Sequence, residues 1–138
     1  MGVRKAKGAD ILDCVRLAMV EELLSPGEHY LDEAYFKSFL DSEFFFVAED
    51  DSKVVGFLIG EEETEDSAFL NAMAVDKEFR GKGVGGQLLQ HFKDAVSKMG
   101  LKKICLFAPD WNVQTLKFYE KNGFVTTEKK YRYFVASL

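Results

Sequence analysis

The chain has 138 residues, with 18 Lys and Arg against 23 Asp and Glu, which gives a formal net charge of −5 with both His neutral. A hydrophobic share of 47% is too high for intrinsic disorder, and a chain of this length can bury a core without a disulfide or a metal. We therefore expect one domain over residues 1–138. The acidic balance disfavours nonspecific nucleic-acid binding, which needs basic surface.

Neither a membrane anchor nor a metal site is expected. The longest apolar runs, residues 44–48 and 54–59, are far shorter than the roughly 18–20 residues that cross a bilayer. The charged first residues run into Asp10 rather than into an apolar stretch, so they do not indicate a secretory signal. Cys14 and Cys105 are far apart and form no Cys-x-x-Cys motif, so they indicate neither a zinc site nor a disulfide scaffold. We expect a reducing cytoplasm.

Residues 3–7 are predicted to form a short first strand. After it, Asp10 can cap a helix whose apolar residues recur at helical spacing, and the Ser-Pro-Gly sequence at 25–27 ends that helix. A second helix is predicted over residues 31–40, with its large apolar side chains on one face.

The period then changes to that of strands. Residues 43–49 and 53–61 are rich in aromatic and β-branched side chains, and the turn residues 50–52 separate them, which predicts a hairpin. The three phenylalanines at 44–46 alternate between the two faces of the first strand. We expect all three to be interior, because helices should cover both faces of the sheet.

The second half of the chain alternates strands and helices. An acidic turn at 61–66 leads to a buried strand, and a glycine loop then leads to an amphipathic helix closed by Gly100. The predicted elements are a strand at 68–75, the glycine loop at 81–86, a helix from Val84 to Met99, a strand at 103–108, a helix at 112–121 stopped by Asn122-Gly123, and two strands over 124–135 joined near Lys129-Lys130. The order β-α-α-β-β-β-α-β-α-β-β predicts an α/β domain with a mixed sheet.

The glycine loop, Arg80-Gly81-Lys82-Gly83-Val84-Gly85-Gly86, predicts an anion site. It lies between a strand and a helix, where unpaired N–H groups and the positive end of the helix dipole converge. A glycine-rich turn without a ligand is the alternative. The P-loop pattern fails, because the Lys and the hydroxyl that it needs are missing. Gly81, Gly83 and Gly86 do satisfy the dinucleotide fingerprint, but the next strand lacks the expected acidic end.

Two motifs favour a different family. Arg-x-x-Gly-x-Gly at 80–85 is followed, one strand later, by Asn-Val-Gln-Thr-Leu-Lys-Phe-Tyr-Glu-Lys-Asn-Gly-Phe at 112–124. Together they resemble the GNAT superfamily of acetyl-CoA-dependent N-acetyltransferases, and the resemblance covers residues 71–124 well. It implies a single GNAT domain with a mixed, mostly antiparallel central sheet flanked by helices.

The resemblance also implies how acetyl-CoA is held. Backbone groups of the fourth strand would pair with the pantetheine arm and the acetyl carbonyl, and the glycine loop would hold the pyrophosphate. Asn112 would bond the cofactor arm, serve as a helix N-cap, or do both. The implied cofactor-binding residues are Met73, Ala74, Val75, Arg80, Gly81, Lys82, Gly83, Val84, Gly85, Gly86 and Asn112.

For catalysis, the resemblance implies that the Tyr119 hydroxyl protonates the departing thiolate, although a Tyr beside Phe118 on an amphipathic helix is more often a core residue. The carboxylate base that some members carry on the fourth strand is missing from residues 68–71. Asn71 cannot accept a proton but can orient a water molecule. The base is therefore left unassigned.

The acceptor is expected to be a primary amine, because the family places it beside the N-terminal helices and the hairpin, and both regions are acidic here. They contain Glu21, Glu22, Glu28, Asp32, Glu33 and the turn at 61–66. We expect a small-molecule amine, a polyamine, or a peptide or protein amine, with Glu21, Glu22 and Asn71 as weak substrate-site candidates. The alternative is a solvated acidic surface.

Three functions remain open from the sequence: an active N-acetyltransferase, a catalytically idle GNAT-like module that binds acetyl-CoA as a sensor or scaffold, and a dinucleotide binder. The apolar strand near Tyr131, with Tyr133, Phe134 and Val135, could bury a homodimer surface or complete the chain's own sheet.

Overall fold

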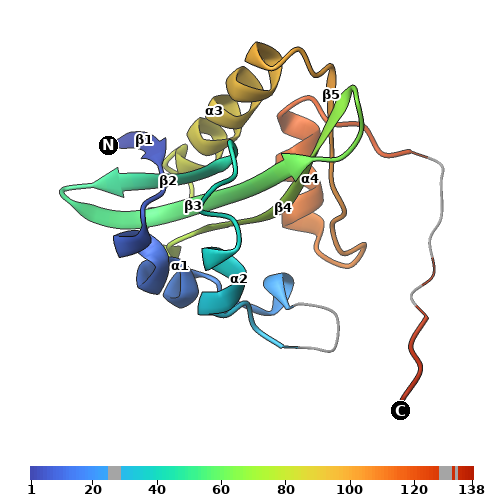
Figure 1. The fold of residues 1–138 in the computed structure, drawn as a ribbon, viewed down its shortest axis with the longest axis horizontal. Helices are drawn as coiled ribbons and strands as arrows, with labels where there is room; N and C mark the ends of the chain where they lie inside the picture. Colours follow the sequence, from blue (N-terminus) through green and yellow to red (C-terminus); the bar gives the residue numbers. More distant parts are fainter. Residues whose placement is uncertain (25–28, 128–131, 133) are drawn as a thin grey trace. The chain divides into compact units, whose positions relative to one another are not determined.

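A computed structural model describes residues 1–24, 29–127, 132 and 134–138, apart from the side chain of Glu21. The chain divides into two compact units, Met1–Phe107 and Ala108–Leu138. With η denoting a short 3-10 helix, the first unit contains β1 Gly2–Lys5, η1 Gly8–Asp10, α1 Ile11–Leu17, η2 Glu21–Leu23, α2 Glu33–Lys37, β2 Phe45–Asp50, β3 Lys53–Glu62, β4 Ser67–Val75, η3 Lys77–Phe79, α3 Val84–Lys98 and β5 Lys103–Cys105 (Figure 1). The second contains α4 Val113–Lys121.

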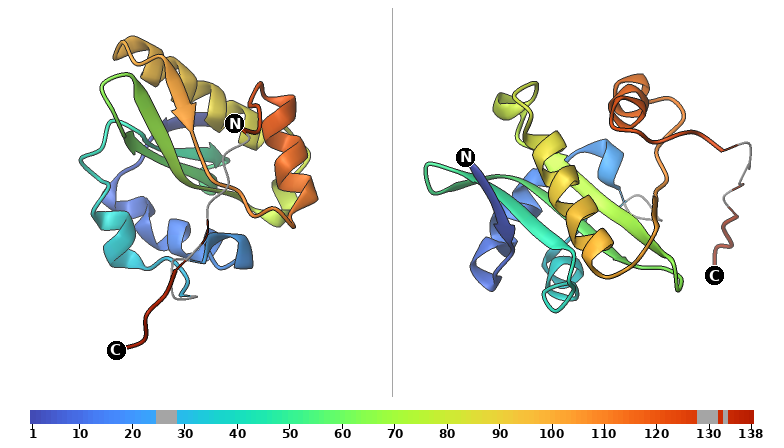
Figure 2. Two further views of the ribbon diagram at one scale, coloured as in Figure 1. Left: turned by 90° about the vertical axis from the view of Figure 1, so that its right-hand side faces the viewer. Right: turned by 90° about the horizontal axis from the view of Figure 1, so that it is seen from above.

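The first unit is built on a five-stranded sheet in the order β1-β2-β3-β4-β5. Neighbouring strands are antiparallel except for β4 and β5, which run parallel. Helices α1 and α2 cover one face and α3 covers the other, as the views in Figure 1 and Figure 2 agree. The expected mostly antiparallel sheet flanked by helices is confirmed.

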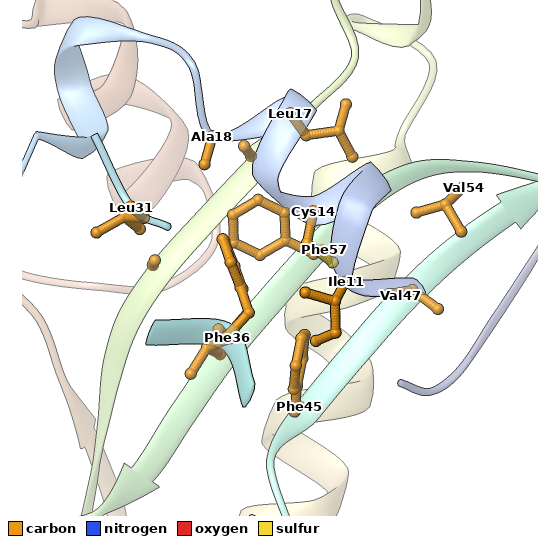
Figure 3. Packing of buried hydrophobic residues seen from close by; sticks show 13 residues of the cluster. Ile11, Cys14, Leu17, Ala18, Leu31, Phe36, Phe45, Val47, Val54 and Phe57 are labelled. Carbon is orange, nitrogen blue, oxygen red and sulfur yellow. The ribbon is translucent and has the colours of Figure 1, made fainter. Parts of the chain in front are cut away.

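The core on the first face forms between α1, α2 and the central strands (Figure 3). Phe36 of α2 is fully buried, and its ring packs edge-on against Phe57 at 5.1 Å between centroids. The side chains in this cluster are Ile11, Cys14, Leu17, Ala18, Leu31, Phe36, Phe45, Val47, Val54, Phe57, Ile59, Ala72 and Ala74. They are apolar, so their burial supplies the main force that holds the two helices to the sheet.

On the opposite face, two glycines of β3 let α3 approach the sheet closely. A Cβ at Gly60 would stand 2.5 Å from Cζ of Phe92, and one at Gly56 would stand 3.1 Å from Cδ1 of Leu88. Phe92 is fully buried and packs edge-on against Phe44 at 5.2 Å. The position of α3, and with it the loop at its N-terminus, therefore depends on the missing side chains of β3.

Several predicted elements are confirmed. The hairpin β2–β3 closes at Asp51 and Ser52, whose positive φ angles of 47° and 62° are those of a tight hairpin turn. All three phenylalanines at 44–46 are buried; Phe44 contacts Phe92 of α3, whereas Phe45 contacts Phe36 of α2. Gly100, with a φ of 79°, follows α3 as predicted.

The first predicted helix is shorter than expected. It ends at Leu17, and a separate turn, η2, follows, while the predicted stop at 25–27 lies outside the described residues. The reason is that the apolar stripe through Cys14 and Ala18 continues onto Glu21 and Glu22, and a longer helix would turn these charges toward the core. The second helix likewise spans only Glu33–Lys37, with Asp32 as its N-cap.

In the second unit, α4 ends at Lys121 as predicted, and Gly123 follows with a φ of 92°. The two strands predicted over 124–135 do not appear among described residues 124–127, 132 and 134–138, and the join at Lys129-Lys130 lies outside them, as do Tyr131 and Tyr133. Strands need ladder partners, and the Phe124 N–H instead donates to the Tyr119 carbonyl at 3.0 Å. Across the described residues, we find no helix long and apolar enough to span a membrane.

Candidate functional site

The sheet opens between β4 and β5. These strands pair at three positions, Ser67 with Lys103, Ala68 with Ile104, and Phe69 with Cys105. Beyond Phe69, β4 continues to Val75 with β3 on one side, and in the described part of the chain no strand pairs with its other edge. Unpaired strand edges offer backbone donors and acceptors to an extended ligand. The predicted cofactor residues Met73, Ala74 and Val75 lie at the end of this edge.

The carbonyl of Val75 already has a partner, because Nε of Arg80 donates to it at 3.2 Å. Met73 and Val75 are half-buried, whereas Ala74 is buried against the first core. The open edge and the glycine loop are thus joined by a side chain. A backbone carbonyl can accept two hydrogen bonds, so Val75 can still accept one from a ligand while Arg80 stays beside it.

Asp76 fixes the point at which the chain leaves β4. Its carboxylate accepts a hydrogen bond from the Glu78 N–H at 3.0 Å, and it lies 3.4 Å from Nη1 of Arg16 and 3.7 Å from Nζ of Lys53. That N–H bond, with the neighbouring charges of Lys53 and Arg16, lowers the pKa of Asp76. The carboxylate therefore stays charged near neutral pH and connects the end of β4 and η3 to α1 and β3.

Helix α3 begins inside the predicted glycine loop, so the loop is shorter than expected. Gly81 and Gly83 have φ angles of 77° and 84°, which require glycine, and Gly83 is the N-cap of α3. Val84 is already helical, and its side chain is buried against Gly56. The first helical bond of α3 runs from the Gln87 N–H to the Gly83 carbonyl at 3.0 Å. The N–H groups of residues 84–86 therefore precede the helix's own bonding pattern and suit an anion.

Gly86 leaves open space beside the first turn of α3. It lies inside a helix, where glycine costs about 1 kcal/mol relative to alanine. Its φ is not positive, and a Cβ there would meet nothing within 4 Å. Protein packing therefore gives no reason for glycine, whereas a phosphate approaching the helix backbone does. Lys82, exposed and 5.2 Å from the Phe79 ring centroid, adds positive charge. The residues fit a pyrophosphate.

A bulge in β4 changes the side of the strand to which the Asn71 side chain points. Ile59 pairs with Ala72 and Gly60 pairs with Leu70, which leaves Asn71 as the extra residue. Its Nδ2 donates to Oε1 of Glu61 at 3.0 Å. Its Oδ1 is buried and finds no hydrogen-bond partner among the residues that the structure describes. The sequence identified Asn71 but missed Glu61 as its partner, because a bulge leaves no clear mark in the residue pattern.

The acidic residues near α1 and α2 that the sequence suggests for acceptor binding differ in their surroundings. Glu21 and Glu22 both belong to η2, and the side chain of Glu22 is exposed. Glu28 lies outside the described residues. Asp32 accepts from the Tyr35 N–H at 2.9 Å as the cap of α2, and Glu33 lies 3.5 Å from Lys37. Asp32 and Glu33 therefore have structural partners. The predicted role of Glu21 and Glu22 in binding the acceptor stays a prediction.

The second unit holds the two remaining candidates. The Tyr119 ring packs against Phe118 and Phe124, at 5.2 and 5.5 Å between centroids, and burial raises the pKa of Tyr119 to about 12. Oδ1 of Asn112 accepts from the Thr115 N–H at 3.2 Å, so Asn112 is the N-cap of α4. Its predicted contact with a cofactor stays a prediction.

The fold is similar to those of solved structures. Ard1 from Thermoplasma volcanium superposes with a TM-score of 0.81 at 27% identity, over 91% of this chain and 83% of that one. Naa20 from Chaetomium thermophilum, in complex with a bisubstrate analogue, has a TM-score of 0.77 at 19% identity, over 89% and 70% of the two chains. At that identity, the second likeness shows the fold alone.

Two curated relatives are also named as acetyltransferases. N-alpha-acetyltransferase 30 of Schizosaccharomyces pombe is 31% identical over 97 residues, which is 67% of this chain and 65% of that protein. The Dictyostelium discoideum protein of the same name is 25% identical over 126 residues, 85% and 68% of the two chains. The chain thus spans about two thirds of these relatives. Residues 41–126 also match the family model described as an acetyltransferase (GNAT) domain. That match runs from the start of the hairpin past α4 and takes in β4, the glycine loop and Tyr119, and on this ground the chain belongs to the GNAT family of acetyltransferases.

Proposed function

We propose that this protein is an N-acetyltransferase that transfers an acetyl group from acetyl-CoA to the α-amino group of a peptide or protein. The observation that carries the proposal is the unpaired edge of β4, which leads along the chain to the N-terminus of α3, where a Cβ at Gly86 would meet no protein atom within 4 Å. The relatives named N-alpha-acetyltransferase support the choice of acceptor.

Acetyl-CoA supplies an activated acetyl thioester. The backbone of Met73, Ala74 and Val75 would pair with its pantetheine arm, and residues 80–86 would bind its pyrophosphate through backbone N–H groups, Arg80 and Lys82. Asn112 would reach the arm while it caps α4. In this scheme the neutral amine nitrogen would attack the carbonyl carbon and lose one proton to water, while the carbon–sulfur bond would break and the sulfur would leave as a thiolate. An N–H near the carbonyl oxygen would stabilise the charge that forms there.

Tyr119 is the group that we assign to protonate this thiolate. Because burial raises its pKa to about 12, the hydroxyl keeps its proton throughout the neutral range. It is a weak acid for a thiolate of pKa near 8.5, so the transfer requires short-range geometry rather than acidity. We infer that the protein works in the reducing cytoplasm, where Cys14 and Cys105 stay as thiols.

The test is loss of thioester absorbance from acetyl-CoA with N-terminal peptides, polyamines, lysine-containing peptides and free amino acids. Turnover with α-amino acceptors that is sharply slowed by Tyr119→Phe supports the proposal. Acetyl-CoA binding without turnover would favour the idle sensor or scaffold, which the missing carboxylate on β4 makes the second candidate. Binding of NAD but not of acetyl-CoA would support the dinucleotide alternative instead.

A further inference from the structure

Glu61 of β3 and Asn71 of β4 form a polar pair on the side of the sheet that α1 and α2 cover. Ile59 belongs to the core on that side, and Gly60 faces Phe92 of α3. Because side chains alternate along a strand, Glu61 returns to the α1–α2 side. The bulge brings Asn71 to the same side, as its 3.0 Å bond to Glu61 shows.

The pair lies where the sheet opens. Glu61 is the partner of Phe69, and Phe69 is the last residue of β4 that pairs with β5. Asn71 is therefore at the beginning of the unpaired edge that leads to Met73 and Val75. An amine held by this pair would lie beside the strand along which the thioester is expected to extend.

The orientation of the Asn71 amide is fixed by chemistry. A carboxylate only accepts, so the amide must present Nδ2 to Glu61, and Oδ1 points elsewhere. Oδ1 is buried with no donor among the described residues, which is a costly arrangement for a polar atom. The pair thus holds acceptors only: the exposed carboxylate of Glu61, which a ligand can reach, and behind it the buried amide oxygen of Asn71, which has no donor among the described residues. An ammonium group, with three donors and no acceptor, is their complement.

Tyr35 of α2 lies within range of the Glu61 charge. Burial, followed by the negative charge of Glu61, raises the pKa of Tyr35 to about 12. The Tyr35 ring also packs at 5.4 Å against Phe36 and at 5.1 Å against Phe39. Tyr35 and Phe39 are only half-buried, so part of this aromatic cluster is accessible on the side of the sheet where Glu61 lies.

We propose that Glu61, held in position by Asn71, is the counter-ion that binds the ammonium group of the acceptor beside β4. This rests on the proposed function and adds to it the residue that selects a charged amine. Glu61 is exposed, so the bound ammonium can lose its proton to a water molecule and attack as a neutral amine. Glu61 acts as a binding residue and Asn71 as a positioning residue.

Steady-state kinetics with Glu61→Gln test the proposal, because glutamine keeps the size of the side chain and an oxygen for Asn71. The matched control is Glu62→Gln, which removes the same charge from the next residue of β3, also exposed but on the other side. Each variant is assayed with a peptide bearing a free α-amino group and with an N-acetylated peptide hydrazide, whose only free amine, the hydrazide NH2, is uncharged at neutral pH. Acetyl-CoA binding and thermal unfolding confirm that both variants remain folded.

We expect Glu61→Gln to raise the acceptor KM about tenfold for the charged amine, from the loss of one charged hydrogen bond. The acetyl-CoA KM, the hydrazide KM and the Glu62→Gln values should stay near wild type. Asn71→Ala should raise the same acceptor KM by a smaller factor. Equal KM values for Glu61→Gln and Glu62→Gln, or equal losses on both acceptors, would overturn this inference alone. Wild-type protein that turns over neither acceptor would overturn the proposed function with it.

Discussion

Substitution of Gly60 by alanine should destabilise the protein by forcing α3 away from the sheet. The new Cβ would stand 2.5 and 2.6 Å from Cζ and Cε1 of Phe92 and 3.1 Å from the Phe69 carbonyl oxygen. Phe92 is fully buried and wedged against Phe44, so its ring cannot swing into solvent. Overpacking of this kind costs about 1–3 kcal/mol, and the short distances place Gly60→Ala near the upper end. For a chain of this size that is a fall in Tm of roughly 8–12 °C.

Thermal and urea unfolding followed by circular dichroism measure this effect. Gly8→Ala is the matched control, because a Cβ at Gly8 meets nothing within 4 Å and its φ is not positive. We expect Gly8→Ala to change the free energy of unfolding by less than about 0.5 kcal/mol. Equal stability of Gly60→Ala and Gly8→Ala would refute the packing that we describe.

A double-mutant cycle tests whether Phe92 is the neighbour responsible. Phe92→Leu removes the ring atoms that the new Cβ would meet, at the cost of a small cavity. The double variant should therefore be more stable than the sum of the two single effects predicts, by at least about 1 kcal/mol. Strict additivity would show that the strain of Gly60→Ala comes from elsewhere.

Three further predictions concern the site and the first strand. Gly86→Ala should raise stability by up to about 1 kcal/mol, because alanine favours the helix, while weakening acetyl-CoA binding severalfold in calorimetry; unchanged binding would contradict the ligand space at α3. Tyr119→Phe should lower kcat about 100-fold with little change in acetyl-CoA affinity, and wild-type kcat should not fall near pH 10, because the pKa of Tyr119 is about 12. The Arg4 guanidinium, at 2.8 and 3.0 Å, and the Lys7 N–H lower the pKa of Asp10 below 3.8. The stability from this pair is therefore present above pH 4 and is lost as the pH falls through the lowered pKa that Asp10 has in the folded protein. Asp10→Asn should thus lower the free energy of unfolding more at pH 7 than at pH 2, and equal losses at the two pH values would contradict this.

Patterns that are local in sequence were predicted well. The hairpin, the central strand and the long helix follow from alternation, turn residues and a 3.6-residue stripe, and Gly100 and Gly123 end their helices with positive φ. The glycine loop was located correctly, although α3 begins at Val84, within it. The first residue of a helix is difficult to predict when glycines occur both in the preceding loop and in the first turn of the helix.

Features that depend on distant neighbours were missed. The bulge at Asn71 arises from the register between β3 and β4, and nothing in the sequence around Asn71 identifies Glu61 as its partner. The early end of α1 depends on which side of the helix would face the core at Glu21 and Glu22. Residues 124–127, 132 and 134–138, the described part of the two strands predicted over 124–135, form no strand, because β-branched composition does not by itself supply a pairing partner.

The most direct test of the central claim is titration of the protein with acetyl-CoA, followed by thioester loss when a peptide with a free N-terminus is added. The account predicts saturable binding that Gly86→Ala weakens, and turnover that depends on the free α-amino group. Acetyl-CoA binding that is absent, or that is unaffected by substitutions at Arg80, Lys82 and Gly86, would contradict it.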